Sequence, residues 1–452
     1  MNLGLHIDTT HVGWSMTDDD LSITKRKGQD LIGVVRFQEA DTAEDRRLAR
    51  SARNHRKRVL GMISFVNHSF EGLLNEADPL FLSRLKKSGL YEEDGGYNAG
   101  LFLSKDEAAK FYAKYPTIFH LKDAVISGKE KDIRFIYLTV LHCFKHRGHF
   151  NLGDIKPEQA TDFDFTYNKF RQLLSTTCNL NLTLQDKQVI RDLLLASGNV
   201  RERVSQGMES LSLGNNSVLK VILTLLFGGK GQMANVFPDL KTLQENSDMA
   251  KPANASVLCF DTEDFDLMIE PFTPYLSQDE YLFILAAKAM YDWSLLYKVL
   301  NGESSIRQAM MRRYDKHKED LSLLKDIYYY MDSHGFEGAY HTMFRKTDEN
   351  VNNYACYVGS VVDESKLGKF GLHRSTGSFL KELASQLSEM QESLDKSNPY
   401  YEKISSCLID IEADNFLPKQ KDKRNASIPN VLVSDELAKI LDTAISDRKS
   451  VV

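Results

Sequence analysis

The run of basic residues between positions 46 and 58 is the segment of this chain best suited to bind an anion. It holds six arginines, one lysine and no acidic residue: Arg46, Arg47, Arg50, Arg53, Arg56, Lys57 and Arg58. Guanidinium groups bind phosphate in a bidentate manner. Repulsion among these cations, without acidic i,i+4 partners inside the run, destabilises a free helix. A charge run is ordinarily a solvated face, but this one predicts an anionic partner.

If the run is helical, its cations form a stripe, because positions 46, 50, 53 and 57 follow one another at spacings of four, three and four. A narrower apolar line runs beside the stripe and consists of Leu48, Ala52, Val59 and Met62. This line predicts that the helix packs against something rather than standing free in water.

A second cluster covers residues 142–149, with the sequence HCFKHRGH. His142 and His146 lie one helical turn apart, and His149 could add a third metal ligand. No carboxylate or further cysteine completes the set, so we do not favour a metal site. Lys145 and Arg147 fall at the end of a predicted helix, where they can offset the helix dipole or hold a phosphate. Both alternatives stay open.

Other motifs give no catalytic chemistry. The glycine-rich string at residues 227–231 lacks the Walker spacing and a Ser or Thr after its lysine. No GxSxG or Cys-His signature for a nucleophile is found. The five cysteines form no CxxC pair and are predicted to be reduced thiols: Cys143, Cys178, Cys259, Cys356 and Cys407. We predict no cofactor and no bound metal.

Composition fits a folded protein of two or three domains, with 452 residues, 42% hydrophobic and 27% charged. The net charge of −6 is polarised, since residues 259–280 hold seven acids and no base. This charge does not exclude a nucleic-acid ligand, because the position of the cations decides binding. No apolar run can span a bilayer, and the first residues do not resemble a signal peptide. We predict a soluble cytoplasmic protein without a membrane partner.

The elements that must position these residues are strands at first and helices afterwards. Alternation predicts strands near 3–7, 12–16 and 31–37, which form a meander. A helix follows from Thr42 to about Phe70. Further helices are expected near 104–115, 133–146, 163–174, 183–196, 217–227, 278–300, 306–330, 376–397 and 434–445. Residues 228–254 and 345–372 are predicted to be irregular, the first as a loop or linker.

Six strings together, in order, resemble the type II CRISPR RNA-guided endonucleases. GLHIDTTHVGW at 4–14 resembles the first RuvC strand-turn-strand, and residues 41–58 resemble the arginine-rich bridge helix of that family. The strings that resemble its recognition lobe lie at 115–125, 133–150, 310–325 and 416–441. The resemblance implies a mainly α fold, a helical recognition lobe with a small N-terminal β-meander left from an RNase H-like domain.

One departure concerns the metal. The family presents a metal-binding Asp where this chain has His6, and Asp8 takes the place of the following Gly. Asp8 could be a displaced ligand, but we favour a role as a cap for the turn at Thr9. The later RuvC carboxylates, the HNH domain and the PAM-reading domain do not follow in this sequence. One acid cannot build a two-metal site, so we predict that the chain is not an enzyme.

The resemblance implies three parts: RuvC-like strands at 1–41, a bridge helix at 42–70 and a recognition lobe at 71–452, with 228–254 as a loop or reduced insertion. In the family these parts hold guide RNA, especially its repeat:anti-repeat duplex, by shape and backbone contacts. The residues implied to bind RNA are Arg46, Arg47, Arg50, Arg53, Arg56, Arg58, Lys145, Arg147, Lys419 and Lys421.

Three functions are compatible with these features. The chain could compete with a full-length effector for guide RNA, as an inhibitor or regulator with an anti-CRISPR role. It could be the N-terminal half of a split nuclease that requires a second chain. It could also be a module that binds a protein rather than RNA. We favour the first, with CRISPR guide RNA as the partner.

Overall fold

The computed structural model of the chain describes residues 2–8, 10–37, 43–86, 101–102, 104–149, 155–196, 198–214, 216–245, 252–262, 265–345, 353–358, 379–420 and 423–449. The chain forms two compact units, residues 1–71 and 72–452, and each is described by itself. The predicted division of the chain into three parts stays a prediction. In the described part, no helix is long and apolar enough to cross a membrane.

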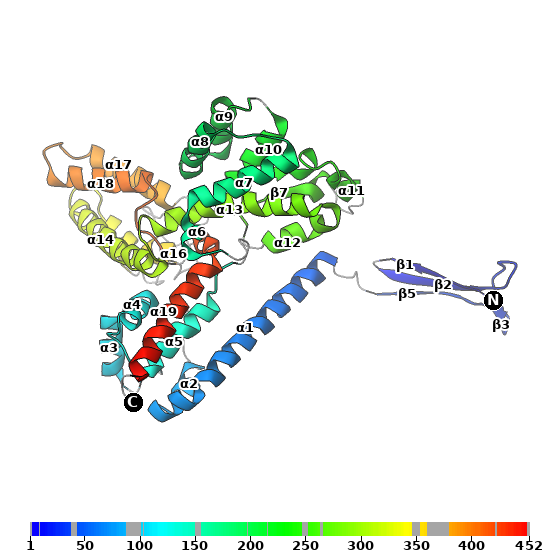
Figure 1. Cartoon of the computed structure of the whole chain (residues 1–452), viewed down its shortest axis with the longest axis horizontal. Coiled ribbons are helices and arrows are strands. Elements are labelled where there is room, and N and C mark those ends of the chain that lie inside the picture. Colours follow the sequence, from blue (N-terminus) through cyan, green and yellow to red (C-terminus); the bar gives the residue numbers. More distant parts are fainter. Residues whose placement is uncertain are drawn as a thin grey trace. The chain divides into compact units, whose positions relative to one another are not determined.

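The first unit begins with a three-stranded antiparallel sheet in the order β1-β2-β5 (Figure 1). Its strands are β1 (Asn2–Ile7), β2 (His11–Thr17) and β5 (Ile32–Arg36). The predicted meander is therefore confirmed. A small hairpin of β3 (Lys25–Arg26) and β4 (Gln29–Asp30) lies between β2 and β5. The sequence reading missed it because its strands are only two residues long.

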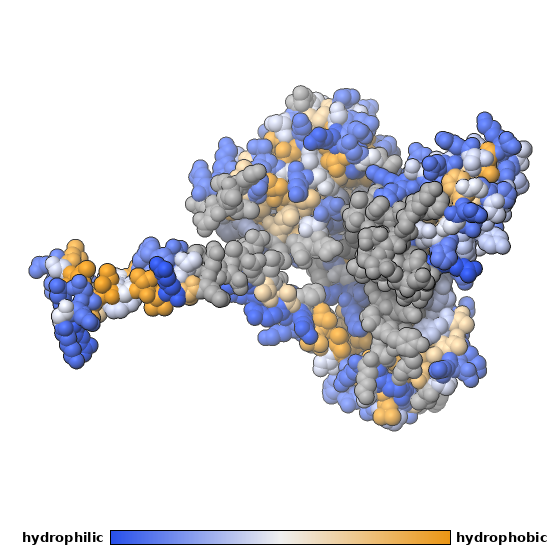
Figure 2. All heavy atoms as spheres, turned by 180° about the vertical axis from the view of Figure 1, so that it is seen from behind, coloured by the Kyte–Doolittle hydropathy of each residue, from blue (hydrophilic) through white to orange (hydrophobic). Residues whose placement is uncertain are grey.

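The register puts the apolar residues of β1 on one face of the sheet, here called the apolar face, whereas the opposite face mixes polar side chains with Ile32 and Val34. Leu5 pairs with Trp14 and Ile7 with Val12, so these side chains share one face, whereas His6 pairs with Gly13 on the other. The apolar face is open to solvent. Figure 2 shows hydrophobic residues at the surface of this sheet, in orange at the left, and Leu5 and Ile7 are 59% and 72% exposed. Such a face predicts a covering partner.

The rest of the first unit is the larger part of α1 (Ala43–Ala77), a helix longer than the predicted 42–70. The described side chains between positions 46 and 58 are all exposed. Along the apolar line Ala52 is exposed, Val59 and Met62 are half-buried, and the side chain of Leu48 lies outside the described residues. That this line packs against a partner stays a prediction.

The second unit is mostly helical and confirms the predicted fold class. Its first group of helices is α2 (Phe81–Leu85), α3 (Lys105–Lys114), α4 (Ile118–Ile126), α5 (Ile133–Lys145) and α19 (Asn430–Lys449). Helices α4, α5 and α19 pack on one another. The predicted start of α3 is confirmed, because the Ser104 side chain accepts a hydrogen bond from the Glu107 N–H.

A second group packs around α13 (Gln278–Leu300), whose bounds match the prediction and whose start is a capping box of Ser277 and Glu280. Its other helices are α6 (Pro157–Thr161), α7 (Phe163–Cys178), α8 (Leu184–Leu195), α9 (Val200–Ser210), α10 (Ser217–Leu226), α11 (Leu240–Glu245) and α12 (Phe265–Ile269). Strands β6 (Lys230–Gln232) and β7 (Val257–Cys259) pair beside them, with 3-10 turns η3 (Met233–Asn235), η4 (Pro252–Ser256) and η5 (Glu270–Tyr275).

The loop interpretation of residues 228–254 is wrong for their described part. This segment contributes β6, η3 and α11, and it buries Met233, Phe237 and Leu240 in the same core as α13. Gly-rich composition suggested a linker, but Gly231 is needed because Leu225 approaches within 2.8 Å of the place that a Cβ would take. Whether the segment is a reduced insertion stays a prediction.

A third group surrounds α14 (Ile306–Asp332) and has a core of its own. Its other helices are α15 (Ala339–Phe344), α16 (Asn353–Val358), α17 (Phe379–Glu392) and α18 (Pro399–Glu412), and η7 (Lys423–Ser427) leads to α19. Most of the irregular segment predicted at 345–372 lies outside the described residues.

A buried ion pair within the first group also connects that group to the third. Lys122 Nζ on α4 donates to Glu436 Oε2 on α19 at 3.1 Å, and the two side chains are 3% and 4% exposed. Glu436 Oε1 also accepts the backbone N–H of Arg307, at 3.0 Å, in the first turn of α14. One carboxylate therefore links three helices.

We predict that Lys122→Met destabilises the fold by about 3–5 kcal/mol, because it leaves the Glu436 carboxylate buried without its cation. The matched control is Lys439→Met, which removes an exposed ion pair between Lys439 and Asp435, both on α19. This loss should cost less than about 1 kcal/mol. Urea unfolding monitored by circular dichroism measures both. Equal losses would contradict the assigned role of the buried pair.

Candidate nucleic-acid interface

The basic stretch of α1 presents its cations to solvent. Arg46, Arg50, Arg53, Arg56, Lys57 and Arg58 are exposed, and none has a carboxylate partner among the residues that the structure describes. The side chain of Arg47 lies outside the described residues. Helical spacing turns the cations at 46, 50, 53 and 57 toward one side, so the stretch can follow a phosphate backbone.

The end of α5 carries the next two predicted residues. Lys145, in the last turn, is exposed, and Arg147 is half-buried just beyond the helix. The Arg147 carbonyl accepts a hydrogen bond from Asn430 Nδ2 at 2.7 Å. The position of Arg147 is thus set by a residue 283 places later in the chain.

A backbone exchange fixes this junction. The His149 N–H donates to the Ile428 carbonyl at 3.1 Å, and the Asn430 N–H donates to the His149 carbonyl at 2.7 Å. Gly148 has a φ of +74°, and a Cβ there would lie 2.6 Å from the Ile428 oxygen. Only glycine fits this close approach without distortion.

Two histidines of the cluster, His142 and His149, are buried enough to favour their neutral form. Burial lowers the pKa of His142 well below its usual 6.5, with Lys122 as a further cause, and burial also lowers the pKa of His149. Among the described residues, the ring nitrogens of His142, His146 and His149 do not gather into a set of three metal ligands, and a ring nitrogen of His149 lies 2.8 Å from the Ser427 carbonyl. The positive charge here comes from Lys145 and Arg147.

The last two predicted residues precede η7. Lys419 is half-buried, and its Nζ lies 3.8 Å from the centre of the Tyr357 ring, which is a cation–π contact. This contact already engages the ammonium group, so Lys419 is less suited to phosphate than the α1 cations. Lys421 lies outside the described residues.

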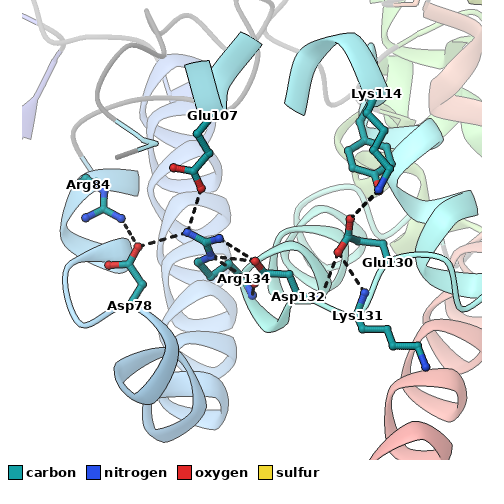
Figure 3. Close-up of polar contacts among 9 residues, drawn as sticks. Asp78, Arg84, Glu107, Lys114, Glu130, Lys131, Asp132 and Arg134 are labelled. Atoms are coloured by element: carbon teal, nitrogen blue, oxygen red, sulfur yellow. Dashed lines mark hydrogen bonds and ion pairs between the residues drawn. The ribbon is translucent and has the colours of Figure 1, made fainter. Parts of the chain in front are cut away.

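Two arginines of the second unit, Arg84 and Arg134, are neutralised within it (Figure 3). Arg134 contacts Asp132 at 2.7 Å, Glu107 at 3.3 Å and Asp78 at 3.6 Å. Arg84 also pairs with Asp78. The hydrogen bonds from Arg134 to Asp132 are the main cause that raises the pKa of Arg134. This network holds the starts of α3 and α5 together and has little charge left for RNA.

The comparisons with known proteins agree with this geometry. A family described as the REC lobe of CRISPR-associated endonuclease Cas9 matches residues 166–446. This chain belongs to that family. The predicted resemblance to the type II CRISPR endonucleases is thereby confirmed.

Two curated relatives extend the similarity over nearly the whole chain. The CRISPR-associated endonuclease Cas9 of Listeria innocua serovar 6a is 26% identical, with 97% of this chain and 32% of the relative covered. That of Streptococcus mutans serotype c is 25% identical, with 97% and 31% covered. The chain spans about a third of the length of the curated relatives it matches.

The predicted RNA-binding residues of this REC-lobe protein fall in both units. Arg46 to Arg58 belong to the first, and Lys145, Arg147 and Lys419 belong to the second. Sequence reasoning missed the junction between residues 147–149 and 427–430. Both segments lie in strings that carried the resemblance, but nothing in a single sequence pairs them.

We predict that Gly148→Ala destabilises the protein by about 2–4 kcal/mol, because it adds both a left-handed backbone penalty and a clash with Ile428. Gly128→Ala is the matched control, since Gly128 has a φ of +69° and nothing within 4 Å of its would-be Cβ. It should cost only about 1 kcal/mol. Thermal unfolding of both variants measures the difference, and equal values would argue against the close approach at Gly148.

Proposed function

We propose that this chain binds a CRISPR guide RNA through the basic stretch of α1, without acting as a nuclease, and withholds that RNA from an active effector. The observation that carries the proposal is the set of exposed cations from Arg46 to Arg58, without acidic residues between them. Membership of the Cas9 REC-lobe family supports an RNA ligand.

The charge distribution favours local binding to a phosphate backbone. The whole chain has a net charge of −6, so long-range attraction cannot hold RNA over the entire surface. Contacts from a helix to successive phosphates recognise shape rather than sequence, which suits a duplex such as the repeat:anti-repeat segment. Lys145 and Arg147 would add a second phosphate contact at the end of α5.

Inactivity as a nuclease is the second part of the proposal. It rests on His6, which occupies the place where the family presents a metal-binding Asp. An imidazole is a poor ligand for the magnesium ions that phosphodiester cleavage uses. A protein that binds the guide without cutting would act as an inhibitor or regulator.

We expect the change of Arg50, Arg53, Arg56 and Arg58 together to Gln to weaken guide-RNA binding. The slope of log affinity against log salt should fall by about 3, because each lost phosphate contact removes 0.7–0.9 from it, roughly. Filter binding across a salt series measures this slope.

The control for this experiment makes the same change in net charge elsewhere. Lys105, Lys110, Lys381 and Lys396 are exposed lysines of the second unit, and changing all four to Gln should leave the slope almost unchanged. If both quadruple variants flatten it equally, binding depends on overall charge and not on α1.

We also predict that the order of addition decides inhibition. Added before guide RNA, the protein should slow DNA cleavage by a full-length Cas9, because it competes for the guide. Added to an effector already loaded with guide, it should have much less effect. The quadruple arginine variant is the control and should not inhibit. Equal inhibition in both orders would point to contact with the effector or its DNA and would remove the sequestration proposal.

A second candidate function is that of one part of a larger nuclease assembly. The observation that favours it is the uncovered apolar face of the β1-β2-β5 sheet, on which Leu5 and Ile7 are exposed. Further strands or helices from another polypeptide segment would bury this face. Copurification of such a polypeptide with the chain would favour this candidate. Preparations that carry RNA but no such polypeptide would favour the first candidate, competition for guide RNA.

A further inference from the structure

The face of the N-terminal sheet opposite Leu5 and Ile7 gathers three potential metal ligands. His6 and Asp8 are two residues apart and share a face of β1 and its extension. The Asp8 N–H donates to the His11 carbonyl at 2.9 Å, which closes a tight turn and sets Asp8 opposite His11. The metal-binding atoms of His6, Asp8 and His11 all lie within 4.8 Å of one another.

The register explains how His6 and His11 meet. His6 pairs with Gly13, and His11 is the diagonal neighbour two residues before it on the same face. Because Gly13 has no side chain, the space next to His6 is left for the His11 ring. The ring centres are 5.6 Å apart. The turn and the strand pairing thus place all three ligands before any metal binds.

These residues do not fit the ion that the family resemblance implies. Magnesium takes oxygen ligands in an octahedral arrangement and avoids imidazole. The group offers two imidazoles and one carboxylate. This set suits zinc and related divalent transition metals, which bind neutral imidazole together with a carboxylate and complete their shell with water.

We propose that His6, Asp8 and His11 form a site for one divalent transition metal of the zinc class. The side chains can close on an ion with small rotations, since His11 Nδ1 already lies 3.8 Å from Asp8 Oδ2. All three ligands are accessible, so an ion can enter from solvent. The site goes beyond RNA binding and does not depend on it.

The bland explanation is that Asp8 only stabilises the turn. The turn is closed by the backbone N–H of Asp8, however, and this hydrogen bond does not require a carboxylate. Nor does a turn require imidazoles at positions 6 and 11. A cap therefore accounts for one residue of the three, whereas a metal site accounts for all of them.

The first experiment titrates the full, untagged chain with Co²⁺ and monitors binding by the visible absorption of the bound ion. The second displaces Co²⁺ with Zn²⁺ and measures Zn²⁺ affinity in competition with a chromogenic chelator. We expect saturation at one ion per chain, with no displacement by millimolar Mg²⁺. His6→Ala and Asp8→Asn each alter a direct ligand. Each should weaken Zn²⁺ binding by about 100-fold, the upper end of what loss of a residue that only supports a ligand costs.

The matched control is His68→Ala. His68 is exposed and lies 3.7 Å from Glu71. Among the described residues this histidine–carboxylate pair has no third ligand, so removing His68 should leave Zn²⁺ affinity unchanged. His6→Asp adds an oxygen ligand and should shift preference from Zn²⁺ toward Mn²⁺. Hydrogen exchange of the β1 and β2 amides checks that each variant keeps the sheet.

Three results would overturn the site. The first is an affinity that falls as much in His68→Ala as in His6→Ala. The second is one ion bound per two chains with dimer formation, which would mean that no single chain supplies the full set. The third is displacement of Zn²⁺ by Mg²⁺ at equal concentration.

Discussion

The Glu436 carboxylate is the point on which the arrangement of the second unit most depends. It receives the Lys122 ammonium group and the Arg307 backbone N–H, so it holds α4, α14 and α19 although Lys122 and Glu436 are 314 residues apart. Desolvating such a pair is costly, and only good geometry compensates for it. With α19 held in this way, its first residues reach His149, and the end of α5 is fixed where Lys145 meets solvent.

A division of charge follows from this packing. Inside the second unit, Arg134 and Arg84 are engaged by carboxylates that join helix starts, and burial keeps His142 and His149 neutral. The described cations of α1 between 46 and 58 are exposed instead. Arg84 and Arg134 thus stabilise the fold of the second unit, whereas the arginines of α1 are exposed to solvent in the first. The sequence indicates this difference only by the lack of acidic residues in the α1 stretch.

The sequence predicted elements where local signals were strong. The predicted bounds of α13 agree with the structure, in which a capping box at Ser277 and a long buried apolar run coincide. Helix α9 was missed because its few apolar residues are spread through a polar segment, and α18 was missed although Asn398 and Pro399 signal its start. The Gly148 junction and the proximity of His6 to His11 depend on long-range or cross-strand pairing, which periodicity along one segment cannot specify.

The alternation of side chains between the two faces of the β1-β2-β5 sheet determines whether partner binding and metal binding can occur together. Leu5, Ile7 and Trp14 share one face of the sheet, and His6 and His11 lie on the other, because side chains alternate at every residue. A partner that covers the apolar face would therefore leave the histidine face open. A shift of register by one residue would exchange the two faces and separate the ligands from one another. Burial of the apolar face by a partner and capture of a metal ion should thus reinforce each other, since both require the same register.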